Sequence, residues 1–412
     1  MRSLLQKILK ILSKAVIKKY SPLVIGITGS VGKTSTKEAV FVVLKNKFNV
    51  QANDASFNNE IGFPMAILGL KTPGKLIWIL NLLESFKLLV FKSKDYPEIL
   101  VLEMGADKPG DIDYLIDIAR PKIGIITAVG ELPVHLEFYS GPEEVAKEKS
   151  KLIQALPTNG LAILNYDDEI VFRMSDLSRA ETITYGFNVG ADIKASDLSY
   201  FIDSDLRIGG GISFKASFEK SVVPFRLINA LGKHQIYAVL AGIAVGLHFK
   251  MNLIEISQAL EKLEFPKQRM KLVRGIKNSW IIDDSYNASP LSTHAALDTL
   301  REFGDKAISK TGRGRKMAVL GDMKELGIFT EKAHRLIGNL AGERAEYLWT
   351  VGPAAKFIAD SAFNQMPKEN IMSFNEAEEA GEYLKGFIQE GDIVLVKGSR
   401  AMKMEKIVEV LI

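Results

Sequence analysis

A glycine-rich turn between a strand and a helix constrains the fold of this chain more than any other feature of its sequence. The run LVIGIT at 23–28 is typical of a buried strand, and STKEAVFVVLKNK at 35–47 is typical of a helix. Gly29 and Gly32 lie in the turn between them, where backbone N–H groups can approach a phosphate at the start of the helix. A strand, a phosphate-binding turn and a helix in this order predict an α/β fold.

The segment GITGSVGKTST at 26–36 contains the residues of a nucleotide phosphate loop. Lys33 is expected to reach the β- and γ-phosphates of ATP, and the Thr34 hydroxyl is expected to ligate Mg²⁺. Ile27 stands where the general pattern has its first glycine, and a glycine-rich turn without a ligand is the alternative interpretation. The predicted ATP-binding residues of the loop are Gly29, Ser30, Val31, Gly32, Lys33, Thr34 and Ser35.

Composition excludes several classes of protein. The chain has 412 residues, which predicts two or three domains. Its net charge of +4 is too small for a protein that coats nucleic acid, so no nucleic-acid partner is expected. It has no cysteine, which excludes a disulfide scaffold, a thiol nucleophile and a cysteine zinc site. A GTPase is disfavoured because no convincing N-K-x-D signal is present, and kinases, motors and ligases also use such loops.

The pattern along the chain predicts two α/β domains behind a leading helix. Apolar runs at 98–105, 122–130 and 161–168 alternate with helical segments, as in a parallel sheet covered on both faces. Residues 181–226 alternate with turn signals and predict an antiparallel excursion, and two helices are expected at 234–248 and 253–263. We expect a basic amphipathic helix at 1–22, a central ATP-binding domain at 23–266 and a smaller Rossmann-like α/β domain at 267–412, whose strands are WIIDDSYN, KMAVLGD, YLWTVG and DIVLVKGS.

Two amphipathic segments stand apart from this series. The first twenty residues place lysines on one side of a helix and aliphatic residues on the other, and a helical insert at about 74–93 contains the apolar stretch 76–91. Packing of each on its own domain is slightly favoured. Docking on an anionic membrane surface or on a partner, and packing of the two on each other, are the alternatives. The expected location is cytoplasmic, with peripheral contact at the inner face of the membrane as an additional possibility.

Further motifs, in order, resemble those of the Mur ligase family of peptidoglycan synthesis. They are TGSVGKTST, FNNEIGFPMAIL at 57–68, LEMGADKPGDI at 102–112, HLEFYSGPEEVAKEKSKLI at 135–153, DDSYNASP at 283–290, VLGDMKELG at 319–327 and LVKGSRAMKMEKIV at 395–408. The resemblance implies a ligase that forms an amide bond through an acyl phosphate, with ATP and Mg²⁺ as cofactors. It points to UDP-N-acetylmuramoyl-tripeptide and D-alanyl-D-alanine as substrates. A Mur-like ligase for another carboxylate and a nucleotide-binding regulatory protein are the alternatives.

The resemblance also implies roles for particular residues. Glu103 and His135 match metal ligands of the family, and Lys149 matches the carbamylated lysine that helps to hold a second Mg²⁺. Lys33, Lys149 and His135 are therefore the expected catalytic residues, with Thr34, Glu103, His135 and Lys149 at the metal. Arg269, Asp284 and Asn287 match family residues that contact the nucleotide. The residues expected to contact the substrate are Asn58, Asn59, Lys397, Ser399 and Arg400.

Two departures from the family pattern stand out. Gln235 and Ala238 occupy the two asparagine positions of an H-N-x-x-N pattern, whereas His234 is retained. This departure predicts that an adenine contact is missing or rebuilt. Only about twenty residues precede the phosphate-loop strand, where family members carry a domain that holds the UDP end of the substrate. We therefore expect the UDP moiety to be held differently, or to be absent from the substrate.

Overall fold

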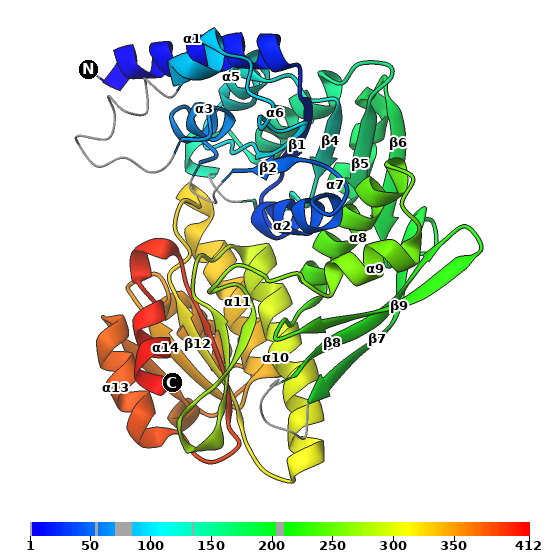
Figure 1. Cartoon of the computed structure of the whole chain (residues 1–412). Coiled ribbons are helices and arrows are strands. Elements are labelled where there is room, and N and C mark those ends of the chain that lie inside the picture. The colour runs from blue at the N-terminus through cyan, green and yellow to red at the C-terminus, as the bar shows by residue number, and fades with distance from the viewer. Residues whose placement is uncertain (1, 54–56, 71–84, 134–135, 203–209) are drawn as a thin grey trace.

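The computed structural model describes residues 2–53, 57–70, 85–133, 136–202 and 210–412 (Figure 1). Strands in these ranges form a nine-stranded sheet in the order β2-β3-β1-β4-β5-β6-β7-β8-β9. The predicted α/β class, with a parallel-sheet central domain and a smaller C-terminal α/β domain, is confirmed. The strands of the first sheet are β1 (Leu23–Thr28), β2 (Val50–Ala52), β3 (Ile99–Glu103), β4 (Ile123–Ile126), β5 (Leu161–Asn165), β6 (Glu181–Gly186), β7 (Ile193–Ile202), β8 (Gly210–Phe218) and β9 (Ser221–Ile228).

Helices cover both faces of the parallel part of this sheet, and alternate residues of β1 therefore enter two different cores. Ile25 and Ile27 pack in the core that includes α2 and α8, whereas Val24 packs in the core that includes α1, α5 and α6. Burial on both faces explains why these strands are almost continuously apolar. The helices of this domain are α1 (Arg2–Tyr20), α2 (Lys33–Leu44), α3 (Gly62–Ile67), α5 (Asp111–Ile118), α6 (Pro142–Gln154), α7 (Glu169–Phe172), α8 (Lys233–His248) and α9 (Leu253–Leu260).

The antiparallel excursion begins later than the sequence predicts. We expected residues 181–226 to be antiparallel, but β6 pairs parallel with β5 from Glu181 to Tyr185 and parallel with the start of β7. The chain between β5 and β6 contains α7 and a short 3-10 helix, and this connection crosses over the sheet to allow parallel pairing. Only β7, β8 and β9 pair antiparallel with one another.

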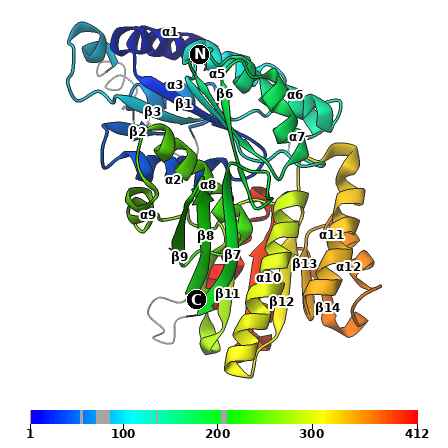
Figure 2. The ribbon, with the colours of Figure 1, turned by 90° about the vertical axis from the view of Figure 1, so that its right-hand side faces the viewer.

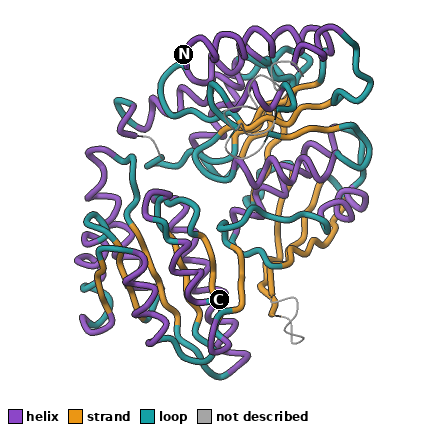
Figure 3. The backbone as a smooth tube through the Cα atoms, turned by 60° about the vertical axis from the view of Figure 1, so that its left-hand side comes forward, coloured by secondary structure: helices purple, strands orange, loops and turns teal. Residues whose placement is uncertain are grey.

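The C-terminal domain contains a six-stranded sheet in the order β10-β11-β15-β12-β13-β14, in which β10 alone pairs antiparallel. Helices again lie on both faces of the sheet (Figure 3). The strands are β10 (Lys271–Arg274), β11 (Trp280–Asp284), β12 (Lys316–Gly321), β13 (Tyr347–Val351), β14 (Ile371–Phe374) and β15 (Ile393–Lys397). The helices are α10 (Pro290–Thr311), α11 (Thr330–Arg344), α12 (Lys356–Ala362), α13 (Ala377–Phe387) and α14 (Glu405–Leu411).

The two domains share one continuous core. Helix α10 lies against β7 (Figure 2), where the rings of Tyr200 and Phe303 meet edge to face with centroids 6.1 Å apart. Phe303 also contacts Trp280 of β11. The extended strands β7 to β9 thus carry the apolar core of the central domain into the C-terminal domain, which fixes the space between them.

The leading helix α1 packs on its own domain, the slightly favoured expectation. Leu9, Leu12 and Val16 are buried against α3 and α5. The C-terminal part of the expected insert also contacts α1, because Lys19 Nζ donates to the carbonyl oxygens of Leu88 and Leu89 at 3.0 and 2.8 Å. The rest of the insert, at 71–84, lies outside the described residues. In the described part of the chain, no helix is long and apolar enough to cross a membrane.

Candidate active site

The phosphate loop joins β1 to α2 at the carboxyl edge of the parallel sheet, where site residues collect in open α/β folds. Gly29 has φ +147°, and a Cβ at this position would lie 2.0 Å from Thr127 Oγ1. Gly32 has φ +89° and precedes the first residue of α2. Lys33 Nζ donates to the Gly29 carbonyl oxygen at 2.8 Å, so the lysine folds back over the loop. The strand, the glycine turn and the helix thus follow one another as the sequence predicts, and the assignment of Lys33 to the phosphates of ATP stays a prediction.

Two predicted metal-site residues meet beside the loop. Thr34 Oγ1 donates to Glu103 Oε2 at 3.0 Å, and Asn58 Nδ2 lies 3.3 Å from Glu103 Oε1. Glu103 ends β3 and is 2% exposed. Its backbone N–H donates to Asn53 Oδ1 at 2.8 Å, which fixes the end of the strand. Sequence analysis missed Asn53, because a lone asparagine after a short strand carries no recognisable signal.

A hydroxyl and a carboxylate next to a phosphate loop are oxygen donors of the kind that Mg²⁺ prefers. Mg²⁺ typically takes one or two protein carboxylates and completes its shell with water and substrate phosphates. No group of three or more His, Asp or Glu side chains is placed to hold a metal in the ranges that the structure covers. The Thr34–Glu103 pair fits a Mg²⁺ ion that takes few ligands from the protein and the others from water and phosphate. His135, the other expected ligand, lies outside the described residues.

Lys149 lies on α6 and its side chain is fully enclosed. Burial, and next the neighbouring positive charge of Lys33, lower the pKa of Lys149 to about 7, although Asp107, Glu148 and Asp111 oppose the shift. Burial also lowers the pKa of Lys33. The flanking Lys147 is exposed and Lys151 pairs with Asp113 and Glu148, so both point away from the buried face, as the helix spacing predicts.

A neutral lysine amine is the form that adds to CO₂, and the product is a carbamate anion. An amine whose pKa is about 7 is about half unprotonated at pH 7, whereas an ordinary lysine is almost fully protonated. A carbamate on Lys149 would also replace repulsion between Lys149 and Lys33 with attraction. The environment of Lys149 therefore fits the modification that the resemblance implies.

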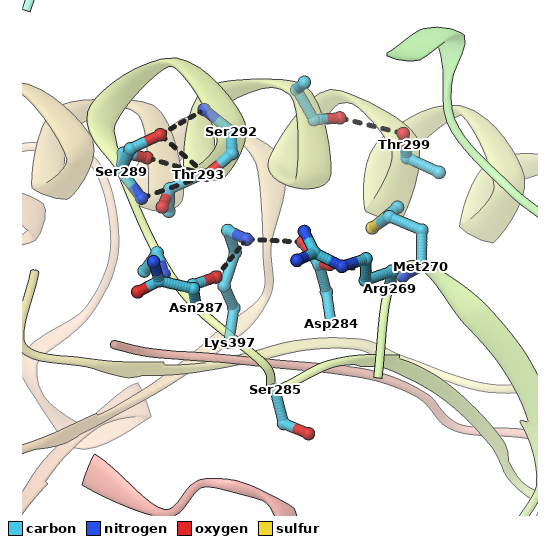
Figure 4. Close-up of polar contacts among 12 residues, drawn as sticks. Arg269, Met270, Asp284, Ser285, Asn287, Ser289, Ser292, Thr293, Thr299 and Lys397 are labelled. Carbon is cyan, nitrogen blue, oxygen red and sulfur yellow. Dashed lines mark hydrogen bonds and ion pairs between the residues drawn. The ribbon is translucent and has the colours of Figure 1, made fainter. Parts of the chain in front are cut away.

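The C-terminal domain contributes a buried ion pair (Figure 4), and both of its residues line a small cavity together with residues of the phosphate loop. Lys397, at the end of β15, makes a short contact with Asp284 at the end of β11, and its Nζ donates to the Asn287 carbonyl oxygen at 2.9 Å. Asp284 also accepts from the Met270 backbone N–H at 3.2 Å. Lys397, expected on the substrate side, thus positions the expected nucleotide residue Asp284.

Arg269 and Arg400 lie over the same ring in the turn after β11. The guanidinium carbon of Arg269 is 4.3 Å from the centroid of Tyr286, and that of Arg400 is 5.6 Å from it. Arg400 is exposed and pairs with Glu405 at 2.9 Å. Tyr286 therefore brings together one residue expected at the nucleotide and one expected at the substrate.

Two other expected substrate residues have structural contacts. Asn59 Oδ1 accepts from the backbone N–H groups of Ile61 and Gly62 at 3.2 and 3.0 Å, which supports the start of α3. Ser399 Oγ accepts from the Lys324 N–H at 2.8 Å and joins β15 to the turn after β12. Their assignment to substrate stays a prediction.

A small cavity of about 60 Å³ separates the phosphate loop from the C-terminal turn. Three buried polar atoms that line it have no hydrogen-bond partner among the described residues, namely Ser30 Oγ, His234 Nδ1 and Gln235 Oε1. Burial lowers the pKa of His234 to about 4, so its ring is neutral at neutral pH. Buried polar groups are rarely left unpaired, so this space is suited to a polar ligand.

A larger cavity of about 630 Å³ adjoins the small one and shares Val31, Gly32, His234 and Ser292 with it. It extends between the ends of β4 and β5, the first turn of α8 and the helix α10. Its volume lies in the range of small-molecule sites. Together the two cavities offer a path from the phosphate loop to a chamber large enough for a nucleoside.

The Mur ligase middle domain model matches residues 27–246, and the Mur ligase glutamate ligase domain model matches residues 268–400. The chain belongs to the Mur ligase family. The expected family is thus confirmed, and with it the class of ATP-dependent ligases that form carbon–nitrogen bonds. The ends of the two matches flank the predicted domain boundary at 266–267, which stays a prediction.

Several named relatives match this Mur ligase over nearly all of its length. It is 30% identical over 402 residues to a UDP-N-acetylmuramoyl-tripeptide–D-alanyl-D-alanine ligase of Bacillus subtilis, covering 97% of this chain and 78% of that enzyme. A MurF ligase of Thermotoga maritima in complex with ADP has a TM-score of 0.77 at 25% identity, over 98% of this chain and 83% of that one. A MurF of Acinetobacter baumannii has a TM-score of 0.78 at 24% identity, over 98% of this chain and 80% of that one.

Gln235 and Ala238, which depart from the family pattern, both have defined places in the structure of this Mur ligase. Gln235 Nε2 donates to the Arg269 carbonyl oxygen at 2.9 Å and joins α8 to the chain that enters the C-terminal domain. Ala238 lines the larger cavity next to Tyr237, whose hydroxyl donates to Asp167 at 2.8 Å. Sequence analysis missed Tyr237 and Asp167, because neither belongs to a recognisable motif.

Proposed function

We propose that this Mur ligase joins D-alanyl-D-alanine to UDP-N-acetylmuramoyl-tripeptide with cleavage of ATP to ADP and phosphate. The observation that carries the proposal is the small cavity between the phosphate loop and the C-terminal turn, with three unpaired buried polar atoms around it. The named relatives support the choice of substrates. We assign the phosphates to this cavity and the nucleoside to the larger one.

The reaction requires two displacements. A carboxylate oxygen at the end of the tripeptide attacks the γ-phosphorus, the bond to the β-γ bridging oxygen breaks, and ADP leaves. The amine of D-alanyl-D-alanine then attacks the acyl phosphate carbon, loses a proton and expels inorganic phosphate. Both steps depend mainly on positioning and charge stabilisation rather than on a covalent enzyme intermediate.

The side chains of the site have complementary tasks in this proposal. Lys33 stabilises the negative charge that develops on the γ-phosphoryl group. Thr34 and Glu103 would hold Mg²⁺, which when bound neutralises phosphate charge. Lys149 as a carbamate adds an anionic ligand next to Lys33. The paired Asp284 and Lys397 hold the C-terminal turn against the nucleotide, and closing the two domains around it excludes water from the acyl phosphate.

Phosphate release from ATP, measured with each of the two other substrates omitted in turn, tests this function. We expect release only when both are present, together with a new product whose mass is the sum of the two minus one water. Release that ignores the UDP-sugar would contradict the proposed substrate and indicate a Mur ligase for another carboxylate. Failure of any tested carboxylate and amine to stimulate release would support a nucleotide-binding protein without ligase activity.

A further inference from the structure

The outward face of α1 combines lysines with exposed aliphatic side chains. Leu4, Lys7, Ile11, Lys14 and Lys18 recur every three or four residues, so they share one side of the helix. Leu4 and Ile11 are 63% and 67% exposed, although the opposite side of α1 is fully packed on the domain. The side chains of this outward face therefore do not contribute to the packing of α1 on its domain.

A second set of exposed apolar side chains lies beside the end of α1. Phe86, Val90 and Phe91 are 53%, 68% and 70% exposed. The Tyr20 hydroxyl lies 3.0 Å from the Leu88 carbonyl oxygen, so this segment is fastened to α1. Figures 1 and 2 both show it at the same outer edge of the central domain as α1, remote from the C-terminal domain.

Positive charge is concentrated in the same two segments. Residues 4–20 and 85–96 carry eight lysines and one aspartate, although the whole chain has a net charge of only +4. The remainder of the chain is therefore net negative. Asp117 lies near this edge, but Lys10 and Lys14 neutralise it at 2.7 and 2.8 Å. No carboxylate in the described parts of the chain pairs with Lys7, Lys18, Lys92 or Lys94.

We propose that this α1 edge, formed by the outward face of α1 and residues 86–94, docks on the surface of an anionic lipid bilayer. Single exposed apolar residues are common on protein surfaces, but five of them interspersed with unpaired lysines are typical of an interfacial site. The lysines complement anionic headgroups, and the aliphatic and aromatic side chains enter the boundary with the acyl chains. Since α1 is already folded and packed, docking requires no folding step.

Docking at this edge leaves the active site open to solutes. The cavities between the phosphate loop and α10 involve none of the residues of the α1 edge. The C-terminal domain, which contributes Asp284 and Lys397, lies at the other end of the molecule from α1 (Figure 3). A bound bilayer would therefore hold the ligase at the membrane without occupying its nucleotide site.

Sedimentation of the full chain with vesicles tests the proposal. The probes are phosphatidylcholine vesicles with about 30% phosphatidylglycerol and vesicles of phosphatidylcholine alone. We expect binding to the anionic vesicles only, and its loss when salt is raised from about 0.1 M to 0.5 M. The double variant Lys7→Glu/Lys18→Glu should bind roughly 25-fold more weakly or worse, since each lysine contributes about fivefold.

The triple variant Phe86→Ser/Val90→Ser/Phe91→Ser tests the apolar part and should also lose binding. Two matched controls change exposed residues elsewhere and should bind normally, namely Val189→Ser/Val222→Ser/Ile254→Ser and Lys220→Glu/Lys262→Glu. Thermal unfolding of every variant checks the fold. Equal binding to both vesicle types, no binding, or variants that bind like the parent would overturn the proposal. So would a dimer that these same variants dissociate, since the edge would then serve a second copy.

Discussion

At the scale of single residues, the site is defined by ionisable side chains that the fold encloses. The positive charge of Lys33 helps burial to lower the pKa of the enclosed Lys149, and burial lowers the pKa of Lys33 as well. Asp284 and Lys397 are buried as well, but they neutralise each other across two strand ends. The environment of Lys149 beside Lys33 therefore favours a chemical modification, whereas the Asp284–Lys397 ion pair holds the C-terminal turn rigidly in place.

The proposed carbamate gives the first prediction. Lys149→Ala should lower turnover by about 100-fold or more, because it removes an anionic ligand from the phosphoryl-transfer site. Acetate or formate should restore part of the activity by filling the same space. Lys147→Ala, on the exposed side of the same helix, is the control and should keep full activity. An unchanged rate in Lys149→Ala would refute the assigned role.

Burial of Lys149 also predicts a pH dependence of stability. Its pKa of about 7 in the folded protein lies below the ordinary lysine value of 10.5, so the unfolded chain binds more protons between these two pH values. Stability from this group therefore rises with pH across that window. Lys149→Met should be more stable than the parent by about 3–5 kcal/mol at pH 7 in CO₂-free buffer, with a smaller gain at pH 10.

Denaturant unfolding of both proteins at the two pH values measures this difference. Lys147→Met serves as the control, because it removes an exposed lysine from the same helix. The gain in unfolding free energy of Lys149→Met over the parent should shrink from pH 7 to pH 10. If it grew or stayed constant, the buried amine would not be the cause of the gain.

The Asp284–Lys397 pair supports a prediction about structure. Asp284→Ala leaves the Lys397 ammonium buried without its carboxylate, which should cost about 3–5 kcal/mol of unfolding free energy. Arg400→Ala breaks the exposed pair with Glu405 and should cost less than about 1 kcal/mol. Equal losses in the two variants, measured by urea unfolding, would show that the buried pair is not the support that we infer.

At the scale of elements, the sequence was most informative where apolar runs end in glycine or polar turns. Strands β1, β3, β4, β5, β11, β12, β13 and β15 were all expected from such runs. The short strands β2 and β14 were not, because three or four half-exposed residues carry no clear period. The parallel pairing of β6 was also missed, since a six-residue alternating run does not reveal which neighbour it will join.

The candidate site was predictable to a similar degree. The phosphate loop follows from the residues alone, whereas Lys149 sits among other lysines in VAKEKSKLI and only the family resemblance separates it from a solvated helix face. Asn53, Tyr237 and Asp167 act through tertiary contacts between distant segments, which local sequence patterns do not encode.

The turn between β1 and α2 gives a prediction for one element. Gly29→Ala should raise the KM for ATP at least about tenfold, because its Cβ would collide with Thr127 and its φ is unfavourable for alanine. Gly386→Ala in α13 is the matched control, since nothing lies within 4 Å of its Cβ position, and it should be neutral or slightly stabilising. Equal KM values for the two variants would contradict the tight turn.

At the scale of the whole molecule, the site exists only where two domains meet. The central domain supplies the phosphate loop, Glu103 and Lys149, and the C-terminal domain supplies the ion pair and Arg269. The core that runs from β7 through Tyr200 and Phe303 into the C-terminal sheet sets their separation. Neither domain alone encloses the two cavities.

Transfer of a carboxylate oxygen to phosphate tests the central claim most directly. We would label the terminal carboxylate of UDP-N-acetylmuramoyl-tripeptide with ¹⁸O, add ATP, Mg²⁺ and D-alanyl-D-alanine, and analyse the phosphate and the joined product by mass spectrometry. An acyl phosphate intermediate predicts one ¹⁸O atom in each phosphate released and one fewer in the amide product. Joined product accompanied by unlabelled phosphate, or no joined product, would contradict the account.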